Sequence, residues 1–195
     1  MTALAEILLH ACCGPCSTFT TEELLAEGFH PTLFFANPNI HPYREYEARR
    51  EALLTLARLR GLPVLLEAEY TPEEFFRRVS FREGDRCRYC YELRLERAAA
   101  KARELGLERF GTTLLISPYQ NRDLIIATGR RLAAEYGLIF HEADWRPGFR
   151  ASQARAKELG LYRQKYCGCL YSERDRFQRA GREGAAPPGS AGEAR

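Results

Sequence analysis

The sequence predicts one α/β domain, built on a parallel five-stranded sheet flanked by helices. Short apolar runs alternate with longer amphipathic segments along most of the 195 residues, which is the pattern of repeated βαβ units. The runs are almost continuously apolar, as strands buried on both faces require. The composition, 45% apolar and 28% charged, is that of an ordinary globular domain, and no internal repeat divides the chain.

The apolar runs are predicted to be strands, at residues 6–10, 32–36, 64–67, 110–116 and 138–141. The amphipathic segments are predicted to be helices, at residues 18–27, 43–60, 71–79, 89–105, 121–136, 151–159 and 172–179. Gly28, Gly61 and Gly137 directly follow three of these helices, where a C-terminal glycine is favoured. We assign residues 1–180 to the domain and expect residues 181–195, rich in Gly, Ala, Pro and charge, to be a disordered tail.

Charge and hydropathy exclude several classes of protein. The net charge of +3 permits a polyanionic partner without requiring one. No apolar run approaches the ~20 residues that span a bilayer, and the first residues lack the basic segment of a signal peptide. We therefore expect a cytoplasmic protein with no membrane partner.

The seven cysteines are the strongest chemical signal. They form three groups along the chain: Cys12, Cys13 and Cys16; Cys87 and Cys90; Cys167 and Cys169. In a reducing compartment, such grouping indicates metal binding or redox chemistry. Four thiolates suit zinc or an iron–sulfur cluster. Structural zinc usually takes two C-x-x-C-like pairs, which the adjacent cysteines do not provide, so we favour iron–sulfur and keep zinc as the alternative.

The remaining cysteines leave alternatives open. A bridge between Cys167 and Cys169 would close a short, strained ring, which is typical of labile or catalytic disulfides, and the pair could also offer two metal ligands. Cys16 is a redox partner, a ligand of a second metal or a buried thiol. His10 and His41 flank the motifs and are either ligands or satisfied polar residues at strand ends.

Polar or cysteine-bearing loops follow four of the predicted strands, at residues 12–16, 37–41, 117–121 and 144–146. Because the carboxyl ends of parallel strands share one edge of the sheet, these loops are expected to build one site. The sequence contains neither G-x-x-x-x-G-K-[ST] nor G-x-G-x-x-G, so a phosphate-cradling loop of those types is not expected.

These motifs resemble the QueH-type epoxyqueuosine reductase family over roughly residues 7–176. The resemblance rests on motifs that follow the family's order: LHACCGPC (9–16), FFANPNIHP (34–42) with Glu45-Tyr46, GDRCRYC (84–90) with Arg94-Leu95, TTLLISPYQN (112–121), DWR (144–146) and YCGC (166–169) with Tyr171-Ser172. It implies a Rossmann-like fold related to the adenine-nucleotide hydrolase-like folds. It also implies the last step of queuosine synthesis, in which the epoxide oxygen of epoxyqueuosine is removed at the wobble position of tRNA.

The resemblance further implies a set of cofactors and ligands. A [4Fe-4S] cluster would be held by Cys12, Cys13, Cys87 and Cys90. The Cys167 and Cys169 pair would be redox-active. An additional mononuclear iron occurs in the family, and its candidate ligands here are Cys16, Asp85 and the redox pair. The implied partners are the tRNA and an electron donor.

Deoxygenation consumes two electrons and two protons, so a second redox unit is expected beside a one-electron cluster: the cysteine pair or the additional iron. Asp144, His10 and Tyr119 are candidate proton donors. The substrate base is expected to be unstacked and held by side chains at the sheet edge, with these candidates: Asn37, Asn39, Tyr119, Gln120, Trp145 and Arg146. Two other interpretations are a zinc-binding RNA-interaction module and a metal-free thiol–disulfide oxidoreductase.

Overall fold

The computed structural model describes residues 4–183 and confirms the predicted sheet. Every neighbouring pair of strands is parallel, and the order across the sheet is β3-β2-β1-β4-β5. The strands are β1 (Ala5–His10), β2 (Phe29–Phe35), β3 (Val64–Leu66), β4 (Arg109–Thr112) and β5 (Ile139–Phe140). Chain order therefore reverses direction at β1, between its neighbours β2 and β4, which is where open α/β sheets place ligands.

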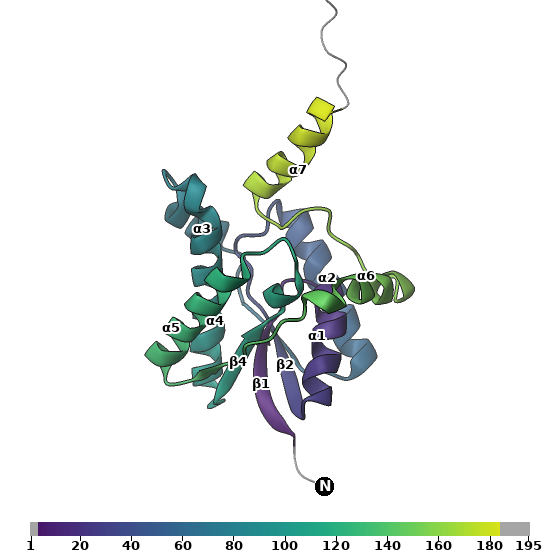
Figure 1. The fold of residues 1–195 in the computed structure, drawn as a ribbon, viewed down its shortest axis with the longest axis vertical. Coiled ribbons are helices and arrows are strands. Elements are labelled where there is room, and N and C mark those ends of the chain that lie inside the picture. Colours follow the sequence, from purple (N-terminus) through teal and green to yellow (C-terminus); the bar gives the residue numbers. More distant parts are fainter. Residues whose placement is uncertain (1–3, 184–195) are drawn as a thin grey trace, which may run out of the picture.

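Helices cover both faces of the sheet (Figure 1). One face carries α1, α2 and α6, and the other carries α4 and α5, with α3 packed beside α4. The helices are α1 (Gly14–Ala26), α2 (Tyr43–Arg60), α3 (Pro72–Val79), α4 (Arg86–Glu104), α5 (Arg122–Tyr136), α6 (Phe149–Glu158) and α7 (Leu170–Glu183). Short 3₁₀ turns add η1 (Glu83–Asp85), η2 (Thr113–Ile116) and η3 (Arg146–Gly148).

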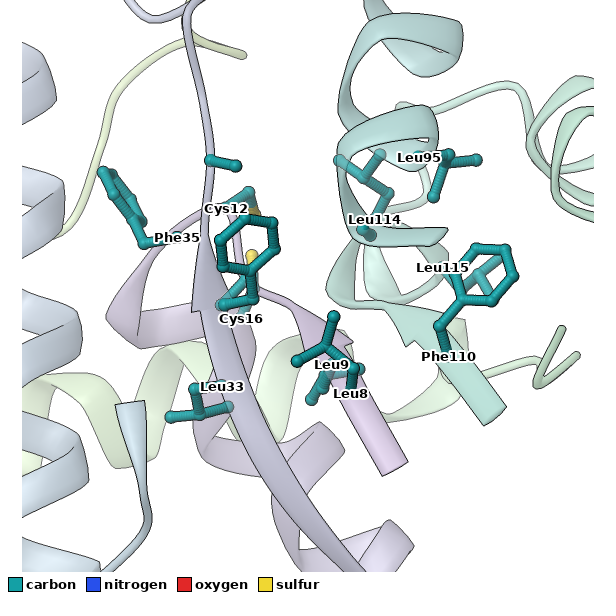
Figure 2. Close-up of a cluster of buried hydrophobic side chains, with 14 of the residues drawn as sticks. Leu8, Leu9, Cys12, Cys16, Leu33, Phe35, Leu95, Phe110, Leu114 and Leu115 are labelled. Carbon is teal, nitrogen blue, oxygen red and sulfur yellow. The ribbon is translucent and has the colours of Figure 1, made fainter. Parts of the chain in front are cut away.

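The core lies along β1, the central strand. Ile7, Leu8 and Leu9 are fully buried because helices cover the sheet on both sides. Cys12 and Cys16 continue the same core beyond the end of β1, beside Leu9 (Figure 2). The first cysteine group is thus part of the main hydrophobic core.

Several element boundaries differ from the prediction, and two of the differences have a clear local cause. Helix α1 begins at Gly14 instead of residue 18, because Cys13 serves as its N-cap and Pro15 occupies the first turn. Strand β4 ends at Thr112, and the predicted residues 113–116 form η2 instead. The Thr112 side chain accepts a hydrogen bond from the Leu114 amide at 3.2 Å and so starts that turn. A short apolar run is equally compatible with a buried strand and with a buried helical turn, so periodicity alone does not distinguish the two.

Helix α7 extends to Glu183, so the first three residues of the predicted tail belong to a helix. The rest of that prediction, residues 184–195, lies outside the described residues. Within residues 4–183, no helix combines the length and apolar character needed to cross a membrane.

Candidate active site at a cluster of cysteines

The loops after β1, β2 and β4 meet at the carboxyl edge of the sheet. The Cys12 amide donates to Thr113 Oγ1 at 3.1 Å, which joins the first loop to η2. His10, the last residue of β1, lies with Nδ1 2.9 Å from Thr112 Oγ1 and Nε2 3.2 Å from Asn37 Oδ1. These bonds join the segments that directly follow β1, β2 and β4, which include two of the four predicted loops, 12–16 and 37–41.

His10 is a satisfied, neutral core residue. Burial, followed by the nearby charge of Arg94, lowers the pKa of His10 to about 4. The Asn37 amide nitrogen donates to the Ala11 carbonyl at 2.9 Å, so its oxygen is the acceptor for His10 Nε2–H. Both ring nitrogens are thus engaged in hydrogen bonds, and the only ring proton is held by Asn37. This favours a structural role for His10 over metal ligation or proton donation.

Cys12, Cys13 and Cys16 form a compact sulfur triad. Their Sγ atoms all lie within 4.8 Å of one another, and those of Cys12 and Cys13 are 3.6 Å apart. Adjacent side chains normally diverge in an extended segment. Here they converge at a bend of the backbone at Cys12, just before α1 begins, and Cys13 Sγ also accepts the Cys16 amide at 3.5 Å. The triad has the geometry of a metal-binding thiolate group.

The triad is built to carry negative charge. Hydrogen bonds from Cys13 and then Cys16 lower the pKa of Cys12 well below its ordinary value, and the Thr113 hydroxyl adds a third bond at 3.3 Å. Burial raises the pKa of Cys13, and hydrogen bonds with the other two thiols raise that of Cys16. Within the triad, negative charge is therefore favoured at Cys12, and a thiolate is the form of cysteine that binds metal.

The second and third cysteine groups lie together. Cys87 and Cys90 lie in the first turn of α4, and Cys90 packs with Cys169 in one buried apolar cluster. Burial, with a further contribution from the charges of Cys167 and Cys169, raises the pKa of Cys90 to about 12. Cys167 faces solvent, while Cys169 is buried. All seven cysteines are free thiols.

Arg94 connects the cysteine groups electrostatically. Its side chain, 1% exposed, donates from Nη2 to Cys90 Sγ at 3.0 Å. Burial alone would lower the pKa of Arg94, but the Coulombic interaction with the thiolate forms of Cys90, Cys167 and Cys12 raises it above its ordinary value. Within residues 4–183 Arg94 forms no ion pair with a carboxylate; its other partners are the Cys90 carbonyl and Asn37. A buried cation requires compensating negative charge, and thiolate sulfur is what this site offers.

Arg49 fixes the Cys167-Gly168-Cys169 segment. This buried arginine donates to the carbonyls of Cys167 and Tyr166 at 2.8 and 2.9 Å and to Glu45 at 2.8 Å. Gly168 has φ +143°, and a Cβ there would come within 3.2 Å of Arg49 Nη1. Glycine is therefore needed at this position.

A cavity of about 370 Å³ opens onto the sulfur atoms. Two amide side chains contact sulfur at its wall: Gln120 Nε2 donates to Cys167 Sγ at 3.1 Å, and Gln164 Nε2 donates to Cys13 Sγ at 3.0 Å. Tyr119 stands at the rim, 83% exposed. The lining residues that bear on the chemistry are Cys12, Cys16, Cys167, Tyr119, Gln120 and Gln164.

Several predicted site residues lie elsewhere. Trp145 is buried in the core, stacked on His141 at 5.7 Å, and does not line the cavity. Asp144 is exposed and ion-paired with Arg146, whose hydrogen bonds lower the pKa of Asp144 to about 2. A carboxylate that is ionised at neutral pH accepts protons, so the structure gives no support for Asp144 as a donor. Asp85 is exposed just before α4, outside the sulfur triad.

Asn39 and His41 are buried polar residues without partners. Both amide atoms of Asn39, a fully buried residue, and both ring nitrogens of His41 lack a hydrogen bond within the described chain. His41 stacks on Phe76 at 4.6 Å, and burial lowers its pKa to about 4. Buried polar groups are almost always paired. These orphaned atoms fit a site that is completed by a bound group.

Sequence reasoning assigned no role to Arg49, Arg94 or Gln164. The two arginines are hidden among many arginines on amphipathic helices, and only tertiary packing shows that they are buried. One signal was available for Arg49: Glu45 lies four residues before it, the spacing of a helical ion pair. Gln164 lies three residues before Cys167, but nothing local marks its side chain as facing the first cysteine group.

Comparison with known proteins identifies the family of the chain. The family profile described as "Epoxyqueuosine reductase QueH" matches residues 7–175. The epoxyqueuosine reductase QueH of Dehalococcoides mccartyi is 39% identical over 172 residues, which is 88% of this chain and 94% of that protein. The protein of the same name from Thermotoga maritima is 38% identical over 189 residues, 90% of this chain and 94% of its own.

A solved structure shows the same fold at lower similarity. It is described as a predicted subunit of tRNA methyltransferase from Methanocaldococcus jannaschii, and it superposes with a TM-score of 0.54 at 16% identity, covering 80% of this chain and 76% of its own. The profile and the curated relatives each span most of the chain. The chain therefore belongs to the epoxyqueuosine reductase QueH family of oxidoreductases.

Proposed function

We propose that this protein reduces epoxyqueuosine to queuosine at the wobble position of a tRNA, in the cytosol, with electrons from a separate donor. The observation that carries the proposal is the meeting of three distant cysteine groups around buried Arg94, beside an open cavity. The names of the curated relatives supply the substrate.

The residues present fit a [4Fe-4S] cluster. We propose Cys12, Cys13, Cys87 and Cys90 as its ligands. The soft thiolate donors, the buried Arg94 cation and the unpaired atoms of Asn39 and His41 all suit an anionic group at this place. The tightest set of sulfur atoms also includes Cys16, which supports Cys16 as a ligand of the additional iron, with Asp85 as a further candidate.

The cavity distinguishes a reaction site from a structural one. Structural zinc sites are closed by four protein ligands, whereas catalytic sites keep an open position. Here a space of about 370 Å³ reaches Cys12, Cys16 and Cys167. This volume is within the range of small-molecule sites and suits a modified base turned out of its loop. A zinc-binding RNA-interaction module would have no need for such an opening.

The reaction must balance two electrons and two protons: the epoxide loses its oxygen as water, and an alkene remains. A [4Fe-4S] cluster, when bound, supplies single electrons. Oxidation of the Cys167 and Cys169 thiols to a disulfide releases two electrons and two protons, so this pair matches the demand. Cys167 lines the cavity and can present its thiol to the substrate, while Cys169 lies behind it against Cys90.

The other cavity residues bind the substrate base and orient it relative to the Cys167 thiol. The exposed ring of Tyr119 is free to stack on a base, and its edge packs against Phe149 at 5.8 Å. Gln120 holds the Cys167 sulfur by its amide, so the thiol keeps a fixed position relative to the stacked base. Gln164 Oε1 is buried without a partner and offers an acceptor inside the site.

Metal content and turnover test the proposal together. Anaerobically purified wild type should be brown and contain about four or more irons, and it should convert epoxyqueuosine in tRNA, detected by mass spectrometry of digested nucleosides. Cys87→Ser should lose the iron–sulfur spectrum, whereas Cys169→Ser should keep the spectrum and lose turnover.

Each rival predicts a different result. Colourless protein with about one zinc would support the RNA-interaction module. Metal-free protein active on dithiol substrates would support the thiol–disulfide oxidoreductase. A full cluster spectrum in Cys87→Ser would overturn the ligand assignment, and unchanged turnover in Cys169→Ser would overturn the redox role of the pair.

A further inference from the structure

The turn between α3 and α4, residues 80–85, projects Phe81 into solvent in an unfavourable conformation. Phe81 is 99% exposed and has φ +61°. Within residues 4–183 no other residue except glycine has a positive φ. For a bulky side chain this conformation is an outlier, and such outliers gather at functional sites. Packing does not explain the ring, because it contacts almost nothing.

The turn is held in place by its own hydrogen bonds. The Phe81 amide donates to Glu83 Oε1 at 3.0 Å, and the Arg82 amide donates to the Val79 carbonyl at 2.8 Å. The Arg82 guanidinium lies over the Tyr89 ring, 5.7 Å from its centre. The aromatic ring is therefore presented from a fixed backbone, which reduces the entropy lost on binding.

Positive charge surrounds the exposed ring. Residues 77–88 contain five arginines, of which Arg78, Arg86 and Arg88 form ion pairs with acidic residues elsewhere in the chain. Arg77 and Arg82 are exposed, and neither forms an ion pair within the described part of the chain. An exposed aromatic ring among unpaired arginines is the chemistry that recognises single-stranded nucleic acid.

The turn also borders the active site. It leads directly into α4, whose first turn carries Cys87 and Cys90. In Figure 1, α3 and the start of α4 lie at the same end of the molecule as α7, the end toward which the strands run. An RNA loop that delivers a base to the cysteine cavity would pass close to this surface.

We propose that Phe81, Arg77 and Arg82 form an RNA-docking surface, on which an unpaired base of the substrate's anticodon loop stacks while the arginines contact neighbouring phosphates. The inference rests on the proposed function, because it takes the anticodon loop as the substrate. Stacking on Phe81 is independent of base identity, so this surface supplies affinity and placement.

Binding of a labelled anticodon stem–loop RNA to the cluster-loaded protein, followed by fluorescence anisotropy, tests the surface. Phe81→Ala should weaken binding about tenfold, as loss of one stacked base does, and Phe81→Trp should restore it. Arg82→Gln should reduce the slope of log affinity against log salt by about one. Leu59→Ala, at a 60% exposed apolar position on α2, is the matched control and should bind as wild type does.

Phe81→Asn separates docking from a structural role. Asparagine adopts positive φ more readily than phenylalanine, so this variant should melt at the same or a higher temperature while losing RNA affinity as Phe81→Ala does. A lower melting temperature with unchanged RNA binding would show a structural role and overturn the proposal. Equal binding by Phe81→Ala and wild type would overturn it while leaving the proposed function intact. If wild type bound the stem–loop no better than a fully paired duplex, both the docking surface and the proposed function would be overturned.

Discussion

Replacing Arg94 by methionine should weaken metal binding at the cysteine site without weakening the metal-free fold. Arg94 donates to Cys90 Sγ at 3.0 Å and has no carboxylate partner among residues 4–183. Its favourable interaction thus depends on negatively charged sulfur, which metal binding creates by removing thiol protons. The variant Arg94→Met keeps an apolar side chain of similar reach and deletes only the charge and the donors.

The expected magnitude follows from the lost bond. A hydrogen bond to a charged group contributes about 1.5–3 kcal/mol, which corresponds to a roughly 10- to 150-fold lower metal affinity. In the metal-free protein, burial raises the pKa of Cys90 to about 12, so the direct partner of Arg94 is uncharged and the same change removes a buried cation with little compensating charge. Replacing buried charge by a well-packed apolar side chain is often neutral or stabilising by about 1–4 kcal/mol. The two states should therefore respond in opposite directions.

Competition for zinc against a chromophoric chelator, under anaerobic conditions, measures the affinity, and urea unfolding of metal-free protein measures the stability. Arg103→Met, at the exposed end of the same helix, is the control for metal affinity, which it should leave unchanged because Arg103 bonds the Tyr136 carbonyl and no sulfur atom. Arg94→Lys keeps the charge and should retain much of the affinity. Wild-type zinc affinity in Arg94→Met, together with a loss of several kcal/mol in the metal-free protein, would refute the charge-compensation argument.

Three further predictions concern the surroundings of the site. Arg49→Met should lower the free energy of unfolding by about 3–5 kcal/mol in urea titrations, because it leaves the buried Glu45 carboxylate without its cation; an effect under 1 kcal/mol would contradict this. Gly168→Ala should cost about 1–3 kcal/mol because φ is +143°, and differential scanning calorimetry should show the loss at unchanged metal content. Burial lowers the pKa of His41 to about 4, so between pH 6.5 and 4 the unfolded chain binds the proton more readily and the free energy of unfolding falls with pH. His41→Phe should therefore reduce the slope of the urea midpoint against pH over this range, with the part due to His10 remaining, whereas His30→Gln, at a half-buried position of β2, should leave the slope as in wild type.

The fold was largely predictable because its signals are local. Each strand of a parallel sheet is an apolar run and each helix an amphipathic one, so β1 and β2 are evident from sequence periodicity alone. The prediction is wrong where the same local sequence pattern is compatible with two kinds of secondary structure. Residues 113–116 are as apolar as a strand but form η2, because the Thr112 side chain caps a turn there.

The candidate site was predictable in its location and only partly in its membership. Parallel topology predicts that loops at the carboxyl edge meet, and the bonds from Cys12 to Thr113 and from His10 to Asn37 show this. The sequence did not predict which side chains of these loops face the cavity. Tyr119 lines the cavity and Trp145 is in the core, although both are aromatic residues in edge loops.

By itself, the sequence determined the α/β architecture, the three cysteine groups and the edge of the sheet where they lie. Tertiary structure alone decided that Cys16 joins Cys12 and Cys13, that Cys169 packs on Cys90, and that Arg94 is buried between the groups. The physical reason is the distance along the chain over which each property is determined. Hydrophobic periodicity is a property of consecutive residues, whereas the burial of a charge and the approach of two sulfur atoms depend on segments that meet only after the chain has folded.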